Sequence, residues 1–159
     1  MSQASAVTPP PPAPATVPRA AWVYGLGGLI PFTFCALLIW LVDAELAGFL
    51  AQVLRAWGAL ILTFLGGVHW GLAIAGYGGQ AADHQRLGIA IAPSLLAGLA
   101  LLVPLALGFV MLAGGFVTLY AIDRACVATG EAPGWYSRLR TPLSAIVVVC
   151  MALGALFAL

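Results

Sequence analysis

A long run without charged side chains constrains the fold of this chain more than any other feature. Residues 87–122 are 36 consecutive positions without Asp, Glu, Lys or Arg, bounded by Arg86 and Asp123. A helix rises about 1.5 Å per residue and needs about 20 apolar residues to cross the hydrocarbon core of a bilayer. The run is too long for one span and fits two, with Pro104 and Gly108 at the turn between them.

The rest of the chain shares this apolar character. Of its 159 residues, 63% are hydrophobic and 7% are charged, and the mean hydropathy is +1.08. Soluble domains carry about 25% charged residues. The net charge of +1 provides no basic surface for a nucleic acid. We therefore predict an all-α, polytopic integral membrane protein, a bundle of five transmembrane helices formed by residues 21–159.

Breaks in the hydropathy place the five spans. Residues 1–20 are rich in Pro and Ala and are predicted to be a disordered cytoplasmic tail. Pro31 lies inside the first span and Pro93 inside the third, and broken helices in membranes commonly line binding sites. The predicted spans are residues 21–42, 50–77, 87–103, 107–122 and 142–159.

The distribution of arginine predicts the orientation, because basic residues in short loops stay in the cytoplasm. With five spans, one side holds every arginine except Arg55. That side also holds the N-terminus, so we expect the N-terminus in the cytoplasm and the C-terminus in the periplasm. The absence of Lys beside abundant Ala, Gly, Leu and Pro is typical of GC-rich coding and favours a bacterial inner (cytoplasmic) membrane. The arginines on the predicted cytoplasmic side are Arg19, Arg86, Arg124, Arg138 and Arg140.

The second span carries the most unusual polar group. His69 and Trp70 lie between glycines in an apolar run, and an ionisable side chain inside a span is by default a functional candidate. By depth, the hydroxyls of Ser94 and Thr118 are the predicted partners of His69, with Asp123 closer to the surface. Three roles stay open for His69: a hydrogen-bonded structural residue, part of a proton or solute path, or a metal or haem ligand.

No cofactor, metal site or catalytic residue is predicted. A metal needs three or four ligands, and the only other histidine, His84, is expected in a loop at a different depth. Trp70 is expected to fill a gap between helices. The sequence lacks the motifs of serine hydrolases, zinc peptidases and phosphate-binding loops, so we do not predict an enzyme.

Three further groups of residues are predicted to position the bundle. Gly67, Gly71 and Ala75 form a face of small residues that lets a second helix approach closely in lipid. Thr141 and Pro142 are predicted as the N-cap and first residue of the last span. Before them, amphipathic aromatics beside arginines are typical of an anchor at the lipid headgroups. The predicted anchor consists of Trp135, Tyr136, Arg138 and Arg140.

These features favour a structural or accessory role in the lipid bilayer. Small-residue faces are plentiful and reactive groups are few, so we expect the protein to pack with other membrane proteins or with a second copy of itself. A small transporter or channel subunit, with a proton or solute path near His69, is the alternative. An intramembrane enzyme or redox protein is the third class.

Three ordered motifs carry a resemblance to a known family: Gly27-Gly28-Leu29-Ile30-Pro31-Phe32, Phe64-Leu65-Gly66-Gly67-Val68-His69-Trp70-Gly71 and Pro133-Gly134-Trp135-Tyr136-Ser137-Arg138-Leu139-Arg140. From about Trp22 to Leu159 the chain resembles the small multi-span membrane proteins of unknown function that include the eukaryotic mitochondrial transmembrane protein 69. The resemblance implies a bacterial inner-membrane relative of a mitochondrial protein, and it brings no catalytic residues with it.

Overall fold

The computed structural model describes residues 16–77 and 84–159, and the helices in this part of the chain follow one another without any strand between them. The predicted all-α class is therefore confirmed. Most of the predicted disordered tail falls on residues 1–15, outside the described residues. The helices are α1 (Arg19–Leu38), α2 (Ala44–Ile74), α3 (His84–Leu102), α4 (Leu105–Ala128) and α5 (Gly134–Phe157).

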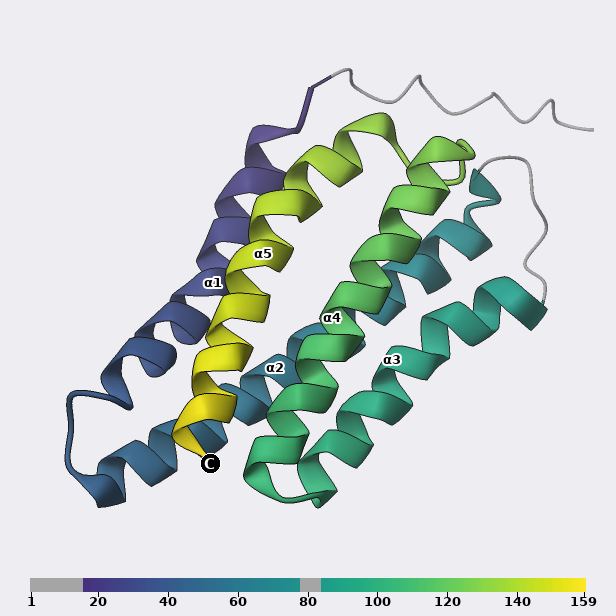
Figure 1. Cartoon of the computed structure of the whole chain (residues 1–159). Coiled ribbons are helices and arrows are strands. Elements are labelled where there is room, and N and C mark those ends of the chain that lie inside the picture. Colours follow the sequence, from purple (N-terminus) through teal and green to yellow (C-terminus); the bar gives the residue numbers. More distant parts are fainter. Residues whose placement is uncertain (1–15, 78–83) are drawn as a thin grey trace, which may run out of the picture.

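The helices form a bundle in which consecutive helices run in opposite directions (Figure 1). α2 crosses behind the others and contacts all of them, while α1 lies against α5 and α3 lies against α4. The alternation brings the starts of α1, α3 and α5 to the same end of the bundle as the ends of α2 and α4. We call this the α5-start end. The C-terminus lies at the opposite end.

The bundle is apolar on its outside as well as inside, which is the pattern of a membrane protein and not of a soluble one. Four helices, α1, α2, α4 and α5, are long and apolar enough to span a membrane, and α3 contributes a shorter apolar segment, Arg86–Leu102. The chain is thus a multi-pass membrane protein. Large exposed apolar side chains on the five helices include Ile30, Phe34, Phe64, Ile74, Leu95, Leu99, Val110, Val117, Val149 and Leu156.

All five helices begin before the predicted spans, and α2 and α5 differ the most. α2 starts at Ala44, because the Asp43 carboxylate caps it by accepting the Leu46 N–H at 3.1 Å. The residues up to Phe49, predicted as a connection, are therefore helical. α5 starts at Gly134, so the prediction that Thr141 and Pro142 begin the last helix was wrong. Pro142 lies inside α5, which continues past a proline as α1 does at Pro31.

The close contact between α2 and its neighbour uses a different glycine from the predicted ones. Gly67 and Gly71 have open space where a Cβ would stand, and both are exposed together with Ala75. Within this chain, the prediction that their face packs against a helix was wrong. Gly66 makes the contact instead, because a Cβ there would collide with the carbonyl oxygen of Ala90 on α3. The inward face of α2 is the one that carries Gly66 and His69.

Candidate functional site

Three helices bring a histidine, an aspartate and an arginine to one depth at the α5-start end of the bundle. His69 lies five residues before the end of α2 at Ile74, and Asp123 lies five residues before the end of α4 at Ala128. Arg140 lies six residues after the start of α5 at Gly134. At about 1.5 Å per residue, all three stand about 8 to 9 Å inside the bundle.

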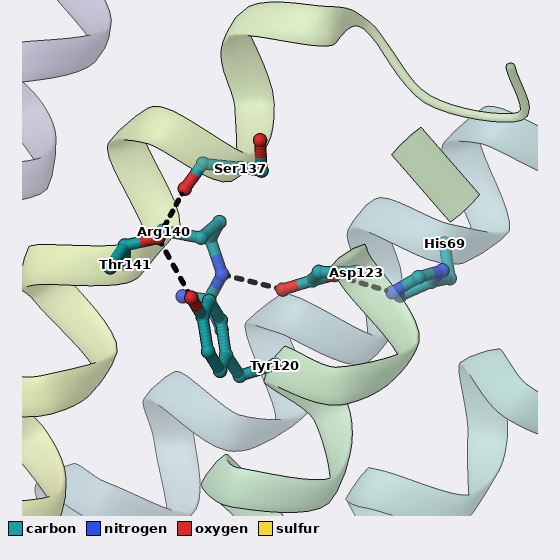
Figure 2. Close-up of polar contacts among 6 residues, drawn as sticks. All are labelled: His69, Tyr120, Asp123, Ser137, Arg140 and Thr141. Atoms are coloured by element: carbon teal, nitrogen blue, oxygen red, sulfur yellow. Dashed lines mark hydrogen bonds and ion pairs between the residues drawn. The ribbon is translucent and has the colours of Figure 1, made fainter. Parts of the chain in front are cut away.

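The Asp123 carboxylate joins the other two side chains, as Figure 2 shows. Its Oδ1 lies 2.9 Å from His69 Nε2, and its Oδ2 accepts a hydrogen bond of 2.7 Å from Arg140 Nε. The exposed fractions are 6% for His69, 1% for Asp123 and 5% for Arg140. We refer to these three residues as the triad.

The triad balances its own charge. The guanidinium of Arg140 neutralises the carboxylate of Asp123, and a buried pair of this kind persists only when both ions are also hydrogen-bonded. An ionised carboxylate only accepts hydrogen bonds, so a neutral His69 donates through Nε2. With His69 neutral, the triad has no net charge.

The part of the chain that contains all three triad residues matches a known protein family. Residues 17–156 match the family described as "Protein of unknown function (DUF3429)". The chain belongs to this family. It is also 38% identical over 138 residues to Transmembrane protein 69 of Xenopus tropicalis, covering 82% of this chain. The chain spans 51% of the length of that relative. No solved structure matches this chain.

Family membership confirms the resemblance drawn from the three motifs. Two of those motifs supply members of the triad, His69 from the second and Arg140 from the third. Asp123 lies outside all three motifs. The family description assigns no activity, so the chemistry of the site has to be argued from its geometry.

His69 contacts Asp123, which was expected nearer the surface, and not the predicted partners Ser94 and Thr118. Ser94 is half-buried on α3, and Thr118 is exposed on α4. Thr118 precedes Asp123 by five residues, about 500° of helix rotation, so the two side chains point about 140° apart. The prediction that Ser94 or Thr118 contacts His69 was therefore wrong. Trp70, adjacent to His69, is 40% exposed and faces outward instead of filling a gap between helices.

The predicted headgroup anchor divides between the inside and the outside of the bundle. Tyr136 and Arg140 are buried, and Arg138 is exposed. Trp135 is half-buried and meets the Tyr136 ring edge to face, with centroids 6.1 Å apart. Since α5 already starts at Gly134, residues four apart in this segment share one face, and the inward face takes Tyr136 and Arg140. For these two residues the anchor prediction was wrong.

A second connection between α4 and α5 runs along the outside. The Tyr120 and Thr141 hydroxyl oxygens lie 2.8 Å apart, and the Thr141 hydroxyl donates to the carbonyl of Ser137 at 2.8 Å (Figure 2). Thr141 therefore bonds back into its own helix, as hydroxyl side chains inside helices often do. This exposed pair and the buried Asp123–Arg140 bond both hold α4 and α5 together.

A small pocket of about 20 Å³ adjoins the triad, and its lining combines charged side chains with apolar ones. His69 lines it together with Arg86 and Glu131, whose charged groups lie 3.9 Å apart. Arg86 also donates to the carbonyl of Tyr77 at 3.1 Å. The volume is about that of a single water molecule. His69 thus adjoins a pocket that two further charged side chains, Arg86 and Glu131, also line.

Arg55 lies at the opposite end of the bundle and is hydrogen-bonded within the protein. Its Nη1 donates to the Val103 carbonyl at 2.9 Å, just beyond the end of α3, and its Nη2 donates to Gln52 at 2.7 Å. A cation at a helix C-terminus satisfies a carbonyl that has no partner within the helix. Within residues 16–77 and 84–159, no group of three or more His, Cys, Asp or Glu side chains is placed to hold a metal ion.

Proposed function

We propose that this protein is a structural or accessory component of a bacterial inner membrane, and that its rigid helix bundle packs with other membrane proteins. The observation that carries the proposal is the use of both Asp123 carboxylate oxygens, which bind one residue from α2 and one from α5. A carboxylate bound by side chains from two other helices fixes their positions relative to α4. Such a site stabilises an arrangement of helices.

The proposal includes five spans, with α3 as the fifth. Its apolar segment Arg86–Leu102 has 17 residues, about 26 Å of helix, which is the short limit for crossing a bilayer. In that topology the α5-start end faces the cytoplasm, because it holds every arginine except Arg55. The C-terminus is then periplasmic.

A proton or solute path near His69 is the second candidate, and the small pocket lined by His69, Arg86 and Glu131 favours it. A path through the membrane must also continue past the triad. Between the triad and Arg55, α2 and α4 contribute apolar side chains that are fully buried, among them Leu62 and Leu112. This packing supports a site open to one side, so the accessory function is preferred.

Chemical cross-linking in native membranes, followed by purification and quantitative mass spectrometry, tests the proposal. We expect one or more membrane proteins, or a second copy of the chain, at a fixed ratio to it. Gly67→Leu or Gly71→Leu should abolish that association without unfolding the bundle, because both positions are open within the chain. Gly98→Leu, at an open and exposed glycine of α3, is the matched control.

The two candidate functions give different results in liposomes. The accessory function predicts no proton or solute flux above that of empty vesicles. A flux that disappears in His69→Phe, together with the absence of any partner at a fixed ratio, would overturn the accessory proposal in favour of the path.

A further inference from the structure

One face of α5 carries three buried polar side chains spaced one turn apart: Tyr136, Arg140 and Ser144. Their exposed fractions are 8%, 5% and 4%. Within the described residues, the Tyr136 hydroxyl, the Arg140 Nη2 and the Ser144 hydroxyl have no hydrogen-bond partner. Buried polar atoms without partners are few in native proteins, because each costs the free energy of its lost hydration. Three on one helix face call for an explanation.

All three residues line a single cavity of about 300 Å³ between α5, α1, α2 and α4. The other walls are apolar and include Leu29, Phe32, Leu65 and Phe116. The volume is that of a small-molecule site, and apolar walls with a few polar groups are the usual composition of one.

The cavity reaches the outer surface of the bundle between α1 and α2. Tyr24 and Phe64 belong to its lining and are 80% and 66% exposed. Gly25 and Gly28 contribute no side chain to the α1 wall. Because this outer surface is the apolar one that faces lipid, a ligand would enter from the hydrocarbon region and not from water.

The polar groups define the chemistry of the ligand. A guanidinium nitrogen only donates hydrogen bonds, and the two hydroxyls can donate as well, so the ligand must offer acceptor oxygens. Asp123 already neutralises Arg140, so a carboxylate ligand would place an uncompensated negative charge in the bundle. Positions four residues apart on a helix are separated by about 6 Å, which suits two acceptor oxygens on one molecule.

We propose that this cavity binds a neutral, lipid-soluble molecule with two acceptor oxygens, the chemistry shared by a quinone ring and by the ester carbonyls of a neutral glycerolipid. Binding is a further activity beside the proposed accessory function and does not depend on it. The ligand head lies along Tyr136, Arg140 and Ser144, and its tail leaves past Tyr24 and Phe64.

Binding to the full-length protein in lipid nanodiscs tests the proposal, with decylubiquinone, dioleoylglycerol and oleate as the probes. We expect saturable binding of one of the two neutral probes, which identifies the source, and much weaker binding of the oleate carboxylate. Gly28→Leu should abolish it, because its side chain enters the cavity through open space. Gly27→Leu, at the neighbouring open glycine outside the cavity lining, should bind normally.

Tyr136→Phe and Ser144→Ala separate ligand binding from folding. Each removes a hydroxyl without a partner, so the thermal stability of the ligand-free protein should stay the same or rise, while affinity falls about tenfold for each lost hydrogen bond. Tyr120→Phe is the control, because its hydroxyl bonds Thr141 outside the cavity. No saturable binding of either neutral probe, equal effects of Gly27→Leu and Gly28→Leu, or preference for oleate would overturn the proposal.

Discussion

The Asp123 carboxylate makes two hydrogen bonds, and their loss would cost different amounts of folding free energy. The bond to Arg140 joins opposite charges at 2.7 Å, whereas the bond to His69 joins the carboxylate to a neutral ring. Removing one partner of a buried ion pair costs about 3–5 kcal/mol, because the other charge is left without compensation. A side-chain hydrogen bond between membrane helices contributes only about 0.6 kcal/mol on average.

Asp123→Ala should therefore destabilise the bundle by about 3–5 kcal/mol, and His69→Phe by about 1 kcal/mol. Unfolding of the purified protein in mixed micelles, followed by helix content against SDS concentration, measures both. Thr118→Val, at an exposed position of α4, is the control and should have no effect. Equal losses in Asp123→Ala and His69→Phe would contradict the ranking.

A double-mutant cycle isolates the bond to the histidine. In the Asp123→Ala background, His69→Phe should cost nothing, since the ring has already lost its acceptor. The same unfolding measurement applies. A full and independent cost for His69→Phe in that background would mean that His69 is held by other groups, and the triad would not be one unit.

At the scale of the helix, adjacent charged residues can have opposite environments. Asp123 is buried and Arg124 is exposed, because successive side chains on a helix point about 100° apart. From the sequence, Asp123 was expected closer to the surface, whereas α4 in fact continues past it to Ala128. His69 could be singled out from sequence as an isolated polar ring. Asp123 could not be identified as its partner from sequence. A charged residue at the edge of an apolar run gives the same sequence pattern whether its side chain faces inward or outward.

The start of α5 illustrates the same limit. α5 begins at Gly134, directly after Pro133, whereas the last span was predicted to begin at residue 142. The next residues were assigned to the headgroup region by composition alone. Spacing held the missing information: Tyr136, Arg140 and Ser144 recur every four residues, in register with Leu139 and Leu143 on the buried face.

Glycine positions on α2 provide a test of this helix-level packing. Gly66→Ala should destabilise by about 1–3 kcal/mol, because the added methyl group meets the Ala90 carbonyl and forces the two helices apart. Gly67→Ala should be neutral or stabilising by up to about 1 kcal/mol, because alanine favours the helix and nothing lies nearby. Unfolding in mixed micelles compares them directly, and a reversed order would refute the observed face of α2.

At the scale of the whole molecule, the number of spans determines the side of the membrane on which each connection between helices lies. Reporter fusions after Gly79, Pro104, Gly130 and Leu159 distinguish four spans from five. With five spans, we expect cytoplasmic reporters at Gly79 and Gly130 and periplasmic ones at Pro104 and Leu159, following the arginine distribution. If α3 does not span, Gly79 and Pro104 will report the same side.

The triad also makes the order of synthesis matter. Asp123 reaches the bilayer before Arg140, which follows 17 residues later in the chain. Until α5 is inserted, α4 holds an acid that lacks its cation, and an unpaired acid in a span opposes insertion. When α5 inserts, Arg140 pairs with Asp123, and the same carboxylate also bonds His69 on α2. Chains truncated before Arg140 should therefore remain loosely inserted and be cleared by membrane proteases, which makes insertion of α5 the step that commits the bundle to its final form.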